Sequence, residues 1–203
     1  MAGALFAHGR LNERDLTSIL AAGSNQVPVA NADTYFAAGD PIFVSESDGS
    51  EVEFLGVATS VTTGQIVTTF ATGQPKAATG KAWKPQSTLA VAGTFGTPEK
   101  RKLDRGLIVQ RSLAGTTFSM DVGASAERFE IDLSGLTPRE LDSLLSWIES
   151  TTAGGTGAFT IVHLDRRVEA VRLTGAPEAI TRASGGRGAA QLPVLSEGRA
   201  TFA

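Results

Sequence analysis

The chain of 203 residues contains no cysteine, and it has only two histidines, two tryptophans and one tyrosine. The absence of cysteine excludes disulfide bonds, thiolate metal sites and cysteine nucleophiles. No run of 18 or more apolar residues occurs, so the sequence predicts no membrane-spanning helix. The first residues have neither a basic start nor a long apolar stretch, and therefore do not resemble a secretory signal peptide.

Charge is sparse and unevenly distributed. Charged residues make up 19% of the chain and the net charge is −3, which gives no general reason to bind nucleic acid. Six acids and no base occur from Asp33 to Glu53, whereas all five lysines lie between Lys76 and Lys102. An acidic stretch thus precedes a basic one. With 41% hydrophobic residues, the chain has enough apolar material to form a folded core.

The composition indicates a fold that is mainly β. Glycine occurs 23 times and recurs between short apolar runs, as expected where tight turns join strands. For residues 1–26 we expect instead an N-terminal arm followed by a short helix. The first nine residues carry no charged side chain, and Leu16, Ile19 and Leu20 recur at helical spacing.

Residues 27–85 are predicted to form a small β-barrel-like module. The Asp48-Gly49 pair lies between two β-prone runs, and glycine there supplies the positive φ of a tight hairpin turn. A second hairpin is expected around Thr63–Gln65, and such short strands suit a compact barrel or sandwich. Residues 86–106 mix glycine, proline and a basic cluster, so we expect a linker there.

Residues 107–203 are predicted to form an antiparallel β-sandwich flanked by one helix. Leu107–Leu113, Phe118–Val122 and Phe129–Leu133 are expected to form a three-stranded meander, because apolar and polar residues alternate in the last two. Three or four further strands are expected after the helix, among residues 158–164, 168–174, 177–182 and 189–195.

The helix is expected over residues 137–152. Thr137 suits the N-cap, Pro138 suits the first helical position, and Glu140 completes a capping box. One apolar stripe, at spacing i, i+3, i+4 and i+7, is formed by Leu141, Leu144, Leu145 and Ile148. A helix with one apolar stripe is expected to pack on a sheet.

No catalytic constellation is recognisable, so we do not expect an enzyme and assign no catalytic, cofactor-binding or metal-binding residue. A serine hydrolase needs a positioned base, yet the G-x-S-x-G motif is absent and the only histidines are His8 and His163. We interpret His163 and Asp165 as an ordinary pair at a strand end. The acids around Asp48 lack the spacing of a calcium-binding loop.

The stretch from Gly73 to Ala82 imitates a phosphate-binding loop. Six residues separate its glycines where the motif has four, and Ala82 stands in place of the magnesium-binding hydroxyl residue. Pro75 also removes one backbone donor, so we reject this motif. A hydrolase with an unidentified pair of carboxylates stays as a less favoured hypothesis.

Four features of the C-terminal half occur together: the alternating strand Phe129–Leu133, the helix with Leu141 and Trp147, the Gly154-Gly155 pair before Ala158–Ile161, and the strand Val171–Leu173. Together they resemble the β-sandwich-plus-helix unit of tailed-bacteriophage tail proteins, which include tail-tube, tail-completion and distal-tail proteins. The resemblance covers residues 107–203 and is one of pattern, since no invariant motif defines these families.

This resemblance implies a non-enzymatic structural subunit of a phage tail or phage-like particle, made in the host cytoplasm and carried in the virion. The additional module at residues 27–85 departs from a plain tail-tube protein and favours a distal-tail, tail-tip, baseplate or connector ring protein. A tail-tube subunit is less favoured. Such a protein would form a homo-oligomeric ring, a hexamer or a trimer among the options, and contact other tail proteins. It would need no cofactor and no specific nucleic-acid site, and whether DNA passes through its channel stays open.

Assembly is expected to use sheet edges and the N-terminal arm. The residues predicted to make protein contacts are Leu5, Phe6, Leu11, Lys100, Arg101 and Arg105. The alternative hypothesis is a receptor- or carbohydrate-binding module, whose loops around Asp48 and Ser184–Gly188 would hold the ligand.

Overall fold

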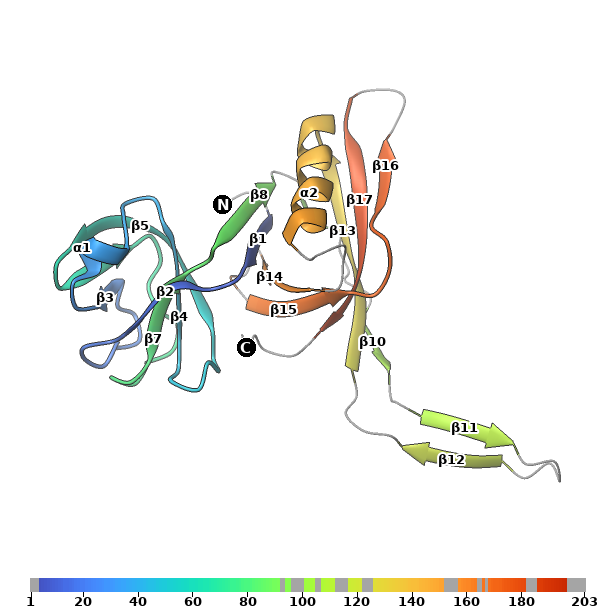
Figure 1. Cartoon of the computed structure of the whole chain (residues 1–203), viewed down its shortest axis with the longest axis horizontal. Coiled ribbons are helices and arrows are strands. Elements are labelled where there is room, and N and C mark those ends of the chain that lie inside the picture. Colours follow the sequence, from blue (N-terminus) through green and yellow to red (C-terminus); the bar gives the residue numbers. More distant parts are fainter. Residues whose placement is uncertain are drawn as a thin grey trace.

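The computed structural model describes residues 4–91, 94–95, 101–104, 107–111, 117–121, 126–151, 157–163, 166, 168–181 and 186–196. The fold is mainly β with one principal helix, as the sequence predicts. Figure 1 shows three parts, which are a small barrel, a larger sheet with its helix, and a separate hairpin.

Residues 11–84 form the barrel. Its elements are Leu11–Asp15 (β2), Gln26–Pro28 (β3), Ala32–Tyr35 (α1), Pro41–Ser45 (β4), Glu53–Thr62 (β5), Gln65–Thr68 (β6) and Lys81–Lys84 (β7). The strands pair in the order β2-β7-β4-β5-β6-β3. The sheet then closes, because Leu16 after β2 bridges Val29 after β3. Closure removes the exposed edges that an open sheet would present.

Both hairpins predicted for this module are confirmed. β4 and β5 pair around the Asp48-Gly49 turn, where Gly49 has a φ of 82°. β5 and β6 pair around Thr63-Gly64. The barrel interior is apolar and is filled by Leu16, Leu20, Val27, Val29, Ala32, Phe36, Ile42, Val44, Leu55, Ala58, Ile66 and Ala82.

The barrel is inserted between two neighbouring strands of the larger sheet. These strands, Ala4–His8 (β1) and Ser87–Val91 (β8), pair along their whole length, with His8 opposite Ser87. Beyond Gly9 the same two segments continue into the barrel as β2 and β7, where Leu11 lies opposite Lys84. One two-stranded ribbon therefore carries the chain into the barrel and back, as Figure 1 shows.

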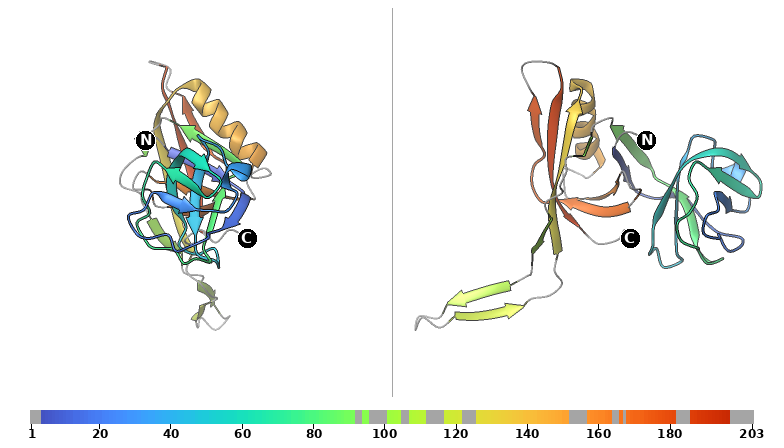
Figure 2. Two further views of the ribbon diagram at one scale, coloured as in Figure 1. Left: turned by 90° about the vertical axis from the view of Figure 1, so that its left-hand side faces the viewer. Right: turned by 180° about the vertical axis from the view of Figure 1, so that it is seen from behind.

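The larger sheet has nine strands. Besides β1 and β8 they are Thr94–Phe95 (β9), Arg101–Asp104 (β10), Ala126–Leu136 (β13), Ala158–Val162 (β14), Val168–Leu173 (β15), Glu178–Thr181 (β16) and Gly188–Ser196 (β17). Their order is β10-β13-β17-β15-β14-β1-β8, with β9 beside β13 and β16 beside β17. Helix α2 (Pro138–Thr151) contacts β8 at one end of this order, and β13 and β17 towards the other end. The sheet therefore curves around the helix (Figure 2).

Helix α2 begins where the sequence predicts. The backbone N–H of Thr137 donates to Glu140 Oε2 at 2.8 Å, and the N–H of Glu140 lies 3.3 Å from Thr137 Oγ1. This is a capping box, and such a cap stabilises a helix by about 1 kcal/mol. Leu136 and Leu141 are both buried in the same core, as the predicted hydrophobic staple requires.

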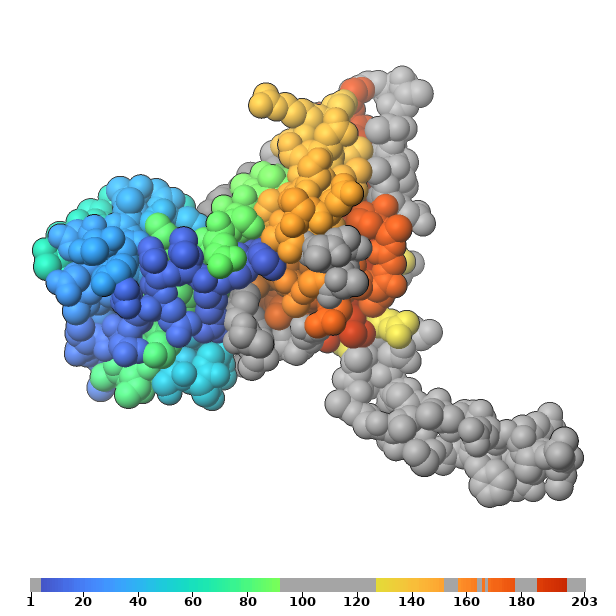
Figure 3. Space-filling view, in the orientation of Figure 1, coloured from blue at the N-terminus to red at the C-terminus, as the bar shows by residue number. Residues whose placement is uncertain are grey.

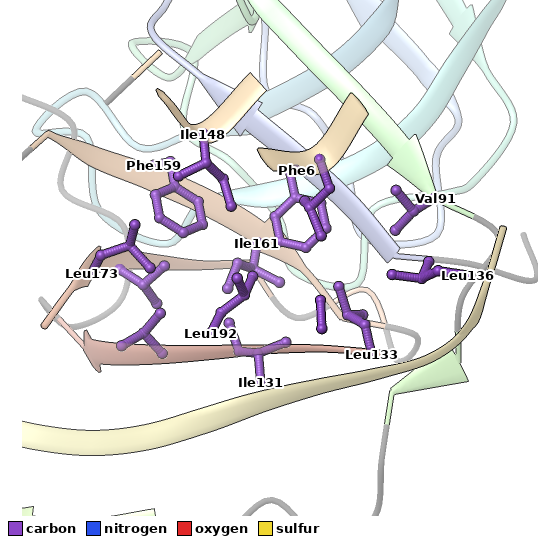
Figure 4. Packing of buried hydrophobic residues seen from close by; sticks show 14 of the residues in the cluster. Phe6, Val91, Ile131, Leu133, Leu136, Ile148, Phe159, Ile161, Leu173 and Leu192 are labelled. Atoms are coloured by element: carbon purple, nitrogen blue, oxygen red, sulfur yellow. The ribbon is translucent and has the colours of Figure 1, made fainter. Parts of the chain in front are cut away.

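The main core lies between α2 and the concave face of the larger sheet. Figure 4 shows Phe6, Phe159 and Ile148 converging from β1, β14 and α2. The rings of Phe6 and Phe159 are 6.2 Å apart, and Trp147 packs edge-on against Phe159 at 6.0 Å. Burial of these apolar side chains explains why β1 and α2, far apart in sequence, are held together.

A second apolar cluster joins the barrel to the larger sheet. Its members from the barrel are Phe43, Phe54 and Trp83, and those from the sheet are Leu5, Ala7, Val162, Val168 and Ala170. The ring of Phe43 stacks on Trp83 at 4.5 Å with an angle of 12° between the planes. In Figure 3 the barrel adjoins the rest of the molecule, and this buried cluster contains residues of both. They are thus linked by a shared core as well as by the ribbon.

The third part is the hairpin of Leu107–Arg111 (β11) and Thr117–Asp121 (β12), which form a two-stranded sheet of their own. In the views of Figures 1 and 2 the hairpin stands away from the larger sheet, on the side opposite the barrel. The pairing of the first two strands of the predicted meander is therefore confirmed, whereas the addition of Phe129–Leu133 as its third strand is wrong. β12 does not pair with β13. Instead, β13 pairs with β17 along nine positions and with β10 and β9 on its other side.

The prediction for residues 1–26 is also wrong. Residues 4–8 are not a free arm, since β1 lies between β14 and β8 inside the larger sheet. The expected short helix is absent, because Leu16 and Leu20 bridge Val29 and Lys76 as extended segments. Ile19, the third residue of the proposed helical stripe, is 68% exposed.

The domain boundaries change accordingly. The barrel begins at Leu11 rather than at residue 27, and the larger domain takes in β1 and β8 from outside the predicted range 107–203. Three parts of the expected linker 86–106 are strands of the larger sheet, namely β8, β9 and β10. The predicted pairs of strands at 158–174 and 177–195 are confirmed as β14–β15 and β16–β17.

Candidate assembly surfaces

The first two predicted contact residues lie inside the chain. Phe6 is fully buried in the main core and Leu5 is 7% exposed in the cluster between the sheet and the barrel. The expectation that both are exposed for contact with a neighbour is therefore wrong. The apolar composition of this segment reflects burial on both faces of a central strand.

Leu11 is accessible, with 42% of its surface exposed, and lies at the start of β2. Arg101 belongs to β10, where its backbone is paired with Phe129. Lys100 and Arg105 lie outside the described residues. Among those of the six predicted contact residues whose side chains the structure describes, Leu11 is thus exposed, and Leu5 and Phe6 are buried.

The hairpin β11–β12 was missed as a separate element, although its residues carry a signal. Its register sets Ile108 opposite Met120 and Gln110 opposite Phe118. Residues directly opposite each other in an antiparallel pair belong to the same face, so Ile108, Met120 and Phe118 share one face of the ribbon. A lone two-stranded ribbon has no core of its own and is marginally stable in water.

A sheet edge is available on the larger sheet. In the strand order β8 comes last, so within the described part of the chain β1 is its one partner strand. The N–H and C=O groups on the far edge of such a strand can pair with another chain. The closed barrel offers no comparable edge, and the larger sheet is therefore the part suited to assembly through strands.

The barrel uses its basic side chains internally. Lys84 Nζ lies 2.6 Å from Asp40 Oδ2, Lys81 pairs with Asp15, and Arg10 Nη1 is 2.7 Å from Glu13 Oε2. The guanidinium of Arg14 lies 3.5 Å from the centre of the Tyr35 ring. The hydrogen bond to Asp15 raises the pKa of Lys81. The fifth base, Lys76, is part of a buried cluster.

That cluster occupies the loop whose sequence imitates a phosphate site. The carboxylate of Glu53 accepts hydrogen bonds from the backbone of Gly73 at 2.7 Å and of Gln74 at 3.1 Å, and from Thr72 Oγ1 at 2.9 Å. Lys76 Nζ, fully buried, lies 2.9 Å from the same carboxylate. These donor groups of the loop are thus already hydrogen bonded to the carboxylate of Glu53, and this agrees with the rejection of a phosphate site.

Two carboxylates of the barrel, those of Glu46 and Asp48, lie at the turn between β4 and β5. The backbone N–H of Ser50 donates to Asp48 Oδ1 at 2.8 Å, and hydrogen bonds from Ser50 hold the pKa of Asp48 below its ordinary value. Within the described residues, no basic side chain lies within ion-pair distance of Glu46 or Asp48. The guanidinium of Arg10 lies close to this turn, with Nη2 3.3 Å from the position that a Cβ on Gly49 would take.

The structure offers no metal-binding cluster within the ranges it describes. No group of three or more His, Asp or Glu side chains is placed to hold a metal ion among these residues. His163 Nε2 lies 3.2 Å from Glu169 Oε2 at the ends of β14 and β15, while its expected neighbour Asp165 lies outside the described residues. Among the described helices, none has the length and apolar character needed to cross a membrane.

Comparison with known protein families and curated proteins found no relative of this chain. No protein-family model matches the chain, and no curated protein has significant sequence similarity to it.

Proposed function

We propose that the chain is a non-enzymatic structural subunit of a phage tail or phage-like particle, which assembles with copies of itself into a ring. The observation that carries this proposal is the hairpin β11–β12, a two-stranded sheet that stands apart from both folded bodies. Its two strands contain apolar residues, and a ribbon of this kind is stabilised when another protein covers it.

Two further features support the proposal. The far edge of β8 is suited to pairing with a strand from a neighbour, so that sheets of adjacent subunits could join. The inserted barrel adds a closed module at a distance from the hairpin, which favours a distal-tail, tail-tip or connector position over a plain tube. Contacts with other tail proteins would then fall to the barrel.

The proposal is tested by replacing residues 107–121 with a short Gly-Ser turn and measuring the molar mass by light scattering. The wild-type chain should form a species of several copies, and the shortened chain should be a monomer with an unchanged far-ultraviolet spectrum of its strands and helix. Alanine at Ser143 and Ser146, on the exposed side of α2, is the matched control and should leave assembly intact. A shortened chain that assembles like the wild type would contradict the role of the hairpin.

A further inference from the structure

Arg14 is a base of the barrel that has no acidic partner within the described part of the chain. Its neighbours on β2 are both acids, but Glu13 pairs with Arg10 and Asp15 pairs with Lys81. The alternation of a strand explains this, because Glu13 and Asp15 are exposed on one face and Arg14 is half-buried on the other. The charge of Arg14 is therefore not paired with either neighbouring carboxylate.

The guanidinium of Arg14 is instead held by an aromatic ring. Its central carbon lies 3.5 Å from the centre of the Tyr35 ring, which is a cation–π contact. Tyr35 is itself fixed, because Asn12 Nδ2 donates to its carbonyl oxygen at 2.6 Å. Asn12 has a φ of 55°, and the pairing of β2 with β7 shifts register between Leu11 and Arg14. A bulge of this kind redirects the side chains beside it, and here Arg14 lies over the ring.

The nitrogen atoms of this guanidinium differ in accessibility. Nε of Arg14 is buried without a hydrogen-bond partner, whereas Nη1 and Nη2 reach the surface and make no hydrogen bond within the described residues. These two terminal nitrogens form a planar fork that matches the two oxygens of a carboxylate. Figures 1 and 2 place α1, which carries Tyr35, on the side of the barrel that faces away from the larger sheet. A partner can therefore approach this part of the barrel from solvent.

We propose that Arg14, held on Tyr35, binds a carboxylate of an acidic segment on another protein of the particle. The inference rests on the proposed function for the nature of this partner, and it names the part of the barrel that receives it. A carboxylate suits the site better than a phosphate, because one guanidinium supplies one positive charge and the other bases of the barrel are paired with acids. Leu11, on the same strand, is 42% exposed and adds apolar surface to the contact.

Tyr35 is the only tyrosine of the chain, so its ring signals report on this site directly. Tyrosine labelled with 13C in the ring, in an otherwise deuterated chain, makes these signals visible by NMR. The probe is a tetraglutamate peptide with blocked ends, added at constant ionic strength, and it should shift the Tyr35 signals in a saturable way. A tetraglutamine peptide with the same blocked ends lacks the carboxylates and should leave the signals unchanged. Wild-type signals that tetraglutamate does not move would overturn the proposal.

Three substitutions separate the guanidinium fork from charge and from folding. R14Q should weaken tetraglutamate binding by roughly tenfold, since it removes a charge-assisted pair of hydrogen bonds. R14K keeps the charge without the fork and should bind less tightly than the wild type. R139Q, at an exposed arginine of α2, is the matched control and should bind like the wild type. Circular dichroism verifies folding, and if R14Q does not fold, R14K and the wild-type titration decide the question. Equal binding by wild type and the Arg14 variants would overturn the assignment.

The remaining outcomes test the choice of ligand and separate this inference from the proposed function. Inorganic phosphate at equal ionic strength should bind more weakly than tetraglutamate, and tighter binding of phosphate would overturn the choice of a carboxylate. A chain that binds tetraglutamate through Arg14 and stays monomeric would contradict the proposed function while leaving the carboxylate site standing. A ring that forms and does not bind tetraglutamate would overturn the site and leave the structural role standing.

Discussion

The ammonium group of Lys76 lies 2.9 Å from a carboxylate oxygen of Glu53, and the lysine side chain has no exposed surface. Glu53 also accepts hydrogen bonds from Thr72, Gly73 and Gln74. The pair therefore fastens the loop after β6 onto β5. The two partners are not equivalent, because the Glu53 carboxylate has three other hydrogen-bond donors, whereas the next carboxylate to the Lys76 ammonium, that of Glu51, is 3.6 Å away.

This asymmetry predicts different costs for removing each partner. E53Q leaves a buried ammonium beside a neutral amide and should lower the free energy of unfolding by about 2–4 kcal/mol. K76M replaces the lysine with an apolar side chain of similar size and leaves Glu53 hydrogen bonded, so its cost should stay near 1 kcal/mol. Urea unfolding of both variants measures the difference. A larger loss for K76M than for E53Q would contradict this account of the pair.

The same carboxylate predicts a dependence of stability on pH. Burial raises the pKa of Glu53, but hydrogen bonds from Lys76, Gly73 and Thr72 outweigh burial, and the pKa lies below its ordinary value of 4.5. A carboxyl with a lowered pKa in the folded state stabilises the protein above its unfolded-state pKa, and this contribution is lost as the pH falls through the folded-state pKa.

The free energy of unfolding should therefore decline below about pH 5 in the wild type and decline less steeply in E53Q. Unfolding in urea at a series of pH values from 7 down to 3 provides the comparison. The difference between the two proteins isolates Glu53 from other acids, such as Asp48, whose pKa is also lowered. Parallel curves for the two proteins would show that Glu53 does not contribute in this way.

Gly56 lies in β5, and the segment that contains Thr69 and Phe70 approaches its backbone closely. It has a φ of 80°, and a Cβ at this position would lie 2.9 Å from Thr69 Cβ and 2.9 Å from the Phe70 ring. G56A should lower the free energy of unfolding by about 2–4 kcal/mol, through backbone strain together with the steric clash.

Gly23 is the matched control for this substitution, because it has the same φ and no atom near the added Cβ. G23A should cost about 1–2 kcal/mol from backbone strain alone. Thermal or urea unfolding measures both variants. Equal losses would mean that the approach of Thr69 and Phe70 does not matter.

The cluster between the barrel and the sheet predicts cooperative unfolding. Trp83 is buried at this joint, whereas Trp147 packs against the main core. In W147F the fluorescence of Trp83 should change together with the far-ultraviolet signal in urea, and in W83F the fluorescence of Trp147 should do the same. Two separated transitions in either variant would show that the barrel and the larger sheet unfold independently.

Sequence patterns located the elements that are determined locally. The capping box at Thr137 and the Asp48-Gly49 turn depend on residues within a few positions of each other, and both are confirmed. The place of β1 could not be read in this way, because Leu5 pairs with Val162 and with Ala90, far along the chain. The apolar segment has the same composition whether it is a free arm or a buried central strand.

Two further failures have physical causes. Leu16 and Leu20 match a helical spacing, but their bridges to Val29 and Lys76 close the barrel and outweigh the local preference. The hairpin β11–β12 has the alternation of a sheet strand, and alternation does not tell which strand is the partner.

The molar mass of the wild-type chain in solution tests the central claim most directly. Sedimentation velocity and native mass spectrometry across a range of concentrations should show a defined species of several 21.0 kDa chains, with ring-shaped particles in electron micrographs. A single species of 21.0 kDa at every concentration and salt level would contradict the claim that this protein is a subunit of a self-assembling ring.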